Sequence, residues 1–144
     1  MQKNKNIYFT VLISFIVLFA CKQPANEGYN PPKLTFKTTA GYIYTDTTIS
    51  AGGAILIGLI AERGEDGPLK SADDLSNVII KMSTNGGSEV AVYEYVMTTA
   101  EAAYYEYDFN TFATAFVGDS VRYNIVVYNK DGYIDQKDLT IISD

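Results

Sequence analysis

Short hydrophobic runs, separated by turn residues, dominate the chain after residue 32. Residues 54–61 form an apolar run that suits a strand buried on both faces, whereas residues 104–109 alternate aromatic and acidic side chains, as in a strand with one wet face. Such closely spaced strands are typical of an all-β sandwich or barrel. About seven strands are expected, over residues 33–38, 54–61, 78–83, 89–98, 104–109, 121–128 and 138–142.

Glycine-rich segments mark the turns between these strands. Asn85-Gly86 supplies the positive φ angles of a tight hairpin and is the strongest local signal in the chain. Gly52-Gly53 and Lys130-Asp131-Gly132 predict two more turns. Residues 61–74 contain glycine, proline and several acids, and they predict a long exposed loop.

The number and length of these strands predict an immunoglobulin-like antiparallel β-sandwich over residues 33–144. One local pattern agrees with this fold. Tyr123 lies two residues before Ile125, which resembles the tyrosine corner of such sandwiches, with Ile125 at the position of the second core cysteine.

The first twenty residues have the layout of a secretory signal. Lys3 and Lys5 precede an apolar or small-residue stretch over residues 7–20, which is short for a transmembrane helix. Leu18-Phe19-Ala20-Cys21 resembles a lipobox, and Cys21 is the only cysteine. That resemblance implies cleavage before Cys21 and a lipid on its thiol. The alternative is an incidental cysteine of an ordinary signal or an uncleaved helix.

Residues 21–32 are expected to form a lipidated cysteine followed by a flexible tether. The segment is polar and carries Pro24, Pro31 and Pro32, which favour an extended chain. Surface-exported lipoproteins of Bacteroidota often carry an acidic cluster after the lipidated cysteine, whereas here Glu27 is the first acid. The sequence therefore leaves open whether the domain faces the periplasm or the cell surface.

The charge and composition exclude several functions. Loss of Lys3 and Lys5 with the signal would change the net charge from −6 to −8. An acidic surface repels phosphate backbones, so nucleic acid is not an expected partner. The chain has no histidine, which is the commonest general base at neutral pH, and no cofactor motif was found.

Acidic residues suggest two possible sites, and each has a simpler interpretation. Asn129, Asp131 and Asp135 resemble part of a calcium loop, but a complete loop needs more carboxylates, so a plain hairpin turn is favoured and no metal is predicted. Paired carboxylates could catalyse glycoside hydrolysis. The candidates alternate with other residues along strands, which favours a solvated face and no enzyme; they are Glu94, Glu101, Glu106 and Asp108.

A group of tyrosines is the remaining candidate for ligand contact. Exposed aromatic rings on a sheet can stack on sugars or anchor a partner protein, but tyrosine is also a common cross-strand residue in sheets. The residues in question are Tyr93, Tyr95, Tyr104, Tyr105 and Tyr107.

The lipobox, the Pro-rich tether, the strand after Pro32 and the segment VRYNIVVYNKDG resemble the small immunoglobulin-like lipoproteins of Bacteroidota. The resemblance implies a sandwich anchored in the outer membrane and implies no reaction. The expected role is an accessory, structural or protein-interaction module of the cell envelope, and the alternative is a glycan-binding module that uses the tyrosines.

Overall fold

The computed structural model describes residues 30–67 and 71–144. The predicted signal, the lipobox, Cys21 and most of the tether lie outside the described residues. The first strand begins at Lys33, directly after Pro31 and Pro32.

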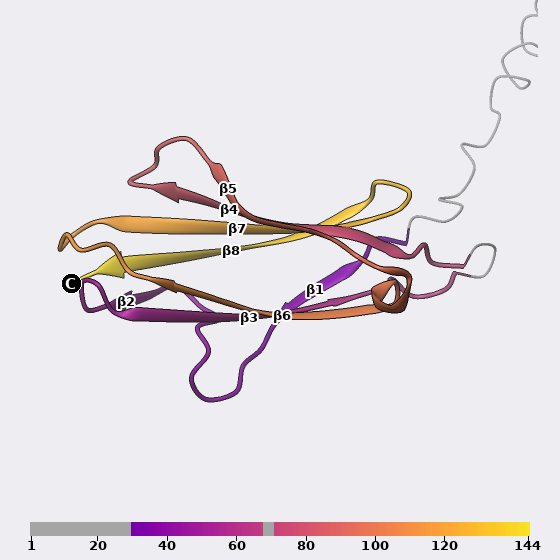
Figure 1. The fold of residues 1–144 in the computed structure, drawn as a ribbon, viewed down its shortest axis with the longest axis horizontal. Helices are drawn as coiled ribbons and strands as arrows, with labels where there is room; N and C mark the ends of the chain where they lie inside the picture. Colours follow the sequence, from indigo (N-terminus) through magenta and orange to yellow (C-terminus); the bar gives the residue numbers. More distant parts are fainter. Residues whose placement is uncertain (1–29, 68–70) are drawn as a thin grey trace, which may run out of the picture.

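The described chain forms two β-sheets that pack face to face as a sandwich (Figure 1). The smaller sheet has the order β1-β3-β6, with β1 at Lys33–Phe36, β3 at Ala54–Glu62 and β6 at Tyr104–Phe112. The larger sheet has the order β2-β8-β7-β4-β5, with β2 at Thr47–Ile49, β4 at Leu75–Thr84, β5 at Val90–Val96, β7 at Ser120–Asn129 and β8 at Ile134–Ser143. A short 3-10 turn, η1, spans Thr99–Glu101.

The core lies between the sheets and is made of alternate residues from both. Ile57 in β3 and Ile125 in β7 are fully buried, which fits their central place in the two layers. Tyr123 is also buried and meets the ring of Phe109 edge-on, with 5.8 Å between ring centroids. Burial of these side chains is the main favourable contribution to folding.

The all-β sandwich was predicted, and its strand order, which the sequence left open, is that of an immunoglobulin-like domain. Strands β1, β3 and β6 occupy the places of A, B and E, and β8, β7, β4 and β5 those of G, F, C and C′. Ile125 is buried in β7, where the second core cysteine of such domains would lie. Tyr123 differs from a tyrosine corner, because its hydroxyl partner is the side chain of Thr111 in β6.

Three strand predictions need correction. The described residues contain eight strands, because β2 was not predicted, and β2 pairs with β8 in parallel, so the sandwich is not wholly antiparallel. The predicted loop at 61–74 begins too early, since Ala61 is buried in β3 and pairs with Tyr105. The last strand begins at Ile134, four positions before the predicted start at Asp138.

The predicted turns at Asn85 and Gly132 are confirmed. Asn85 and Gly86 have φ angles of 51° and 72°, and the Gly87 N–H donates to the Thr84 carbonyl at 2.9 Å. Positive φ at both central residues is the requirement that Asn-Gly meets at little cost. Gly132 also has a positive φ, and it closes the turn between β7 and β8.

Candidate functional site

Four of the five candidate tyrosines lie together between the two sheets, at the side where β5 and β6 form the sheet edges. Tyr93 and Tyr95 project from β5 toward Tyr105 and Tyr107 of β6. Ring centroids are 4.2 Å apart for Tyr93 and Tyr107 and 5.1 Å apart for Tyr95 and Tyr105, and both pairs are stacked. The hydroxyls of Tyr93 and Tyr105 are hydrogen-bonded at 2.7 Å.

We call these four residues the tyrosine layer; it closes one side of the sandwich. Tyr105 is buried, and the other three are half-buried. Stacking within the layer covers one face of each ring, so these four residues do not form a row of fully exposed aromatic faces. Tyr104 points to the outer face of β6, where its hydroxyl donates to Glu106 at 2.9 Å.

Glu101 orders the connection between β5 and β6. Its carboxylate accepts the Thr98 N–H at 2.9 Å, the Thr98 hydroxyl at 2.7 Å and the Tyr95 hydroxyl at 3.0 Å. These bonds hold the pKa of Glu101 below its ordinary value, and the bond from the Thr98 backbone has the largest effect. The same carboxylate raises the pKa of Tyr95 by accepting a hydrogen bond from its hydroxyl group.

Glu106 and Asp108 lie beside each other on the outer face of β6 and share Lys37. The Lys37 ammonium is 2.5 Å from Glu106 and 2.6 Å from Asp108, and it lies 5.2 Å from the centre of the Tyr42 ring. The Tyr42 hydroxyl also donates to Asp108 at 3.0 Å. Lys37 lowers the pKa of both carboxyl groups through its hydrogen bonds, and they raise the pKa of Lys37.

The loop that supplies Lys37 and Tyr42 requires a glycine beneath it. A Cβ atom at Gly58 would lie 2.5 Å from the Lys37 side chain and 2.7 Å from the Tyr42 ring. A glycine within a strand often marks such a close approach. Gly58 interrupts the apolar run of β3. It is the one sequence feature that points to the cluster of Lys37, Tyr42, Glu106 and Asp108, which the sequence did not predict.

Three of the four candidate carboxylates are therefore held in hydrogen bonds or ion pairs within the fold. Glu101, Glu106 and Asp108 have lowered pKa values and stay ionised at neutral pH, so none is suited to act as a general acid there. Glu94 differs from them. It projects from the exposed side of β5, and in residues 30–67 and 71–144 it has no ion pair or hydrogen bond.

Two of the three calcium candidates accept hydrogen bonds from the backbone. The Asn129 carboxamide oxygen accepts the Tyr133 N–H at 2.8 Å, and the Asp135 carboxylate accepts the N–H groups of Leu34 and Gln136, both at 2.8 Å. Asp131 lies in the turn between them. Within the part of the chain that the structure describes, no three acidic side chains gather as a metal site.

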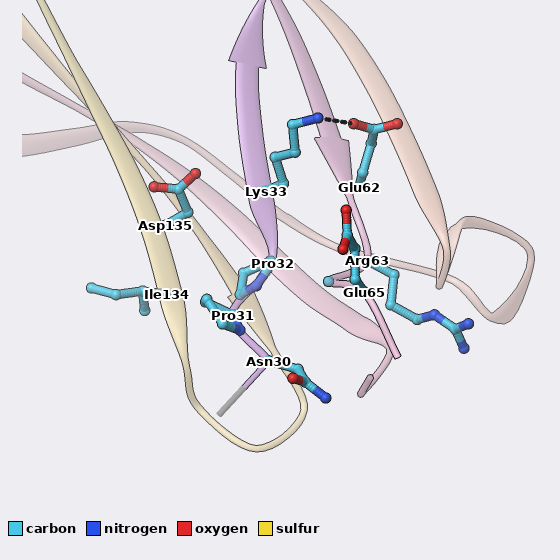
Figure 2. A pocket seen from close by; sticks show the side chains of 10 residues that line it. Asn30, Pro31, Pro32, Lys33, Glu62, Arg63, Glu65, Ile134 and Asp135 are labelled. Carbon is cyan, nitrogen blue, oxygen red and sulfur yellow. Dashed lines mark ion pairs between the residues drawn. The ribbon is translucent and has the colours of Figure 1, made fainter. Parts of the chain in front are cut away.

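A hollow of about 650 Å³ lies at the end of the sandwich where the described chain begins (Figure 2). Residues 30–33, 62–65 and 134–135 line it. Lys33 and Glu62, which are cross-strand partners on β1 and β3, form an ion pair at 3.5 Å, and a Cβ atom at Gly64 would clash with the Pro31 carbonyl oxygen. The hollow is therefore the junction at which residues 30–33 pack on the rest of the sandwich. Its charged residues indicate no particular ligand.

Two groups of large apolar side chains are exposed among the described residues. One is at the end of the sandwich near the C-terminus, with Phe112, Phe116 and Val117. The other is on β5, with Val90, Val92 and Val96. Exposed apolar groups of this kind often mark contacts with other proteins.

Comparisons with known proteins leave the family open. No protein-family model matches the chain, and no curated protein matches it either. Among solved structures, it is similar to the sporulation control protein Spo0M from Bacillus subtilis, with a TM-score of 0.44 and 10% identity over 81% of this chain. The match covers 51% of the Spo0M chain, so this chain spans about half the length of that protein.

The structure shows no helix, within the residues described, that is long and apolar enough to cross a membrane.

Proposed function

We propose that the chain is an envelope lipoprotein, anchored in the outer membrane through lipid on Cys21, with a non-catalytic immunoglobulin-like module that contacts another envelope protein. Leu18-Phe19-Ala20-Cys21 is the observation that carries the anchor, because it combines a lipobox-like pattern with the only cysteine. The face of the membrane that the module occupies is left open by Lys22 and the missing acidic cluster.

The chemistry of the anchor explains why more than one acyl chain is needed. Each buried methylene contributes ~0.8 kcal/mol, and a single chain binds a membrane only reversibly. A diacylglyceryl group on Cys21 would supply two chains. The Pro-rich residues that follow would keep the sandwich at a distance from the bilayer, since proline favours an extended backbone.

The module's side chains favour contact over catalysis. Glu101, Glu106 and Asp108 are held by hydrogen bonds and ion pairs that keep them ionised. Exposed valines along β5 and exposed apolar residues near the C-terminus offer surface to a protein partner. A protein contact is therefore preferred over an enzymatic role.

Replacing Cys21 with Ser is expected to abolish incorporation of labelled palmitate and to release the chain from the membrane fraction. Serine lacks the thiol that accepts the lipid. The matched control is Gln23→Ala, which alters the segment without removing the thiol and should keep labelling and fractionation unchanged. Labelling that persists in Cys21→Ser would refute the anchor.

A further inference from the structure

The two sheets have four edge strands, and they differ in how open they are. Strand β1 has four residues and follows Pro31 and Pro32, and β2 has only three residues. Short strands and adjacent prolines protect an edge from pairing with another chain. The longer edges are β6, with nine residues, and β5, with seven.

The backbone of β5 offers hydrogen-bonding groups on its free side. The Met97 N–H donates to the Ser76 carbonyl of β4 at 2.8 Å. Because the inward and outward groups alternate along an antiparallel strand, Tyr95 and Tyr93 also bond inward, and the N–H and C=O groups of Glu94 and Val96 point outward. A second strand could pair with these four groups.

The side chains around this edge combine apolar contact with one free charge. Val92 and Val96 are 40% and 72% exposed, and Glu94 lies between them in the sequence without an ion pair or hydrogen bond in the described chain. No lysine or proline occurs in 90–96 to block pairing. Stacking of Tyr93 and Tyr95 in the tyrosine layer holds β5 in place before any partner strand binds.

The other long edge lacks a charge of this kind. Glu106 and Asp108 of β6 both form ion pairs with Lys37. An incoming basic residue would have to compete with an ammonium that is already bound at 2.5 Å and 2.6 Å. Only β5, among the described edges, presents both an open backbone and a carboxylate that forms no ion pair with the described residues.

We propose that β5 binds an extended strand of another envelope protein by β-strand addition, with a Lys or Arg of that strand opposite Glu94. This inference rests on the proposed protein-interaction role and names its surface and chemistry. A second copy of the chain is disfavoured, because pairing Glu94 with itself or with Val96 of the other copy puts two carboxylates opposite or diagonal to each other on one face.

The test is the binding of a synthetic strand to the full chain in mild detergent. The probe is a fluorescent peptide of alternating Thr and Val with a central Lys. The residues directly before and after Lys, and every second residue beyond them, carry a methyl group on the backbone nitrogen. The methyl groups block association between peptides, while the Lys amide stays free to pair with Glu94. Fluorescence anisotropy measures the affinity, and a peptide with Glu in place of Lys is the control.

The wild-type chain is expected to bind the Lys peptide about ten-fold more tightly than the Glu peptide, and Glu94→Lys should reverse this preference. Val96→Pro removes an outward N–H without breaking a bond to β4, so it should weaken binding of the Lys peptide, whereas Val96→Thr should not. Circular dichroism and melting would show that each variant is folded.

Three results would overturn the inference. The first is equal affinity for the two peptides. The second is binding that Val96→Pro leaves unchanged. The third is a dimer in analytical ultracentrifugation that Val96→Pro dissociates, which would assign the edge to self-association. Palmitate labelling of Cys21 is independent of all three, so failure at β5 leaves the anchor standing.

Discussion

Truncation of Ile125 to Ala is expected to lower the free energy of unfolding by about 2–5 kcal/mol, the range for buried aliphatic residues reduced to alanine. Ile125 is fully buried in β7, and its cross-strand partners are Ile80 of β4 and Lys137 of β8. The substitution removes apolar contacts and leaves a cavity, because a packed core relaxes only in part. Urea denaturation monitored by circular dichroism would measure the loss.

The matched control is Ile142→Ala, in the neighbouring strand β8. Ile142 is 44% exposed, so the same truncation removes much less buried surface there. Its effect should be well under half that of Ile125→Ala. Equal losses at the two positions would contradict the assignment of Ile125 to the core between the sheets.

A steep loss of stability above about pH 10 is the second expected result, and it comes from the tyrosine layer. Burial raises the pKa of Tyr105 well above its ordinary value, and the hydrogen bond to Tyr93 raises it further. Burial raises the pKa of Tyr107, and the hydrogen bond to Glu101 raises that of Tyr95. In the unfolded chain these hydroxyls ionise at their ordinary pKa.

The direction of the effect follows from proton binding. Below the unfolded pKa both states keep the protons, and pH has no effect through these groups. Above it the unfolded chain loses protons that the folded chain retains, so the unfolded state is favoured increasingly as pH rises toward the folded pKa values. Tyrosinate absorbance and circular dichroism should therefore change together in one alkaline transition.

Tyr105→Phe tests the source of this transition. It removes the most shifted hydroxyl of the tyrosine layer and keeps the stacked ring, so the alkaline midpoint should move to higher pH. Tyr44→Phe, at an exposed position outside the layer, should leave the midpoint unchanged. An unaltered midpoint in Tyr105→Phe would show that the layer does not set the alkaline limit.

The sequence predicted the features that depend on local pattern. The apolar run of β3, the alternation in β6 and the Asn85-Gly86 turn each carry their signal within a few neighbouring residues. Strand β2 was missed because three residues show no period, and its pairing is a parallel one with β8, far along the chain.

The candidate site depended on contacts that the sequence pattern does not record. Alternation predicted one aromatic face for β6, but only the sheet order brings β5 opposite it and makes the tyrosines cover one another. Asp135 resembled a calcium ligand, yet it accepts the N–H of Leu34, which is 101 residues away. Glu106 and Asp108 are exposed, but their ion pairs with Lys37 could not be predicted because Lys37 comes from a distant loop.

The most direct test of the proposed anchor is the intact mass of the chain purified from its membrane. The account predicts one species that begins at Cys21 and exceeds its peptide mass by a diacylglyceryl group and, with an acylated amino terminus, one further acyl chain. Fragmentation should place the added mass on residue 21. A chain that retains Met1, or one that begins elsewhere with an unmodified Cys21, would contradict the account.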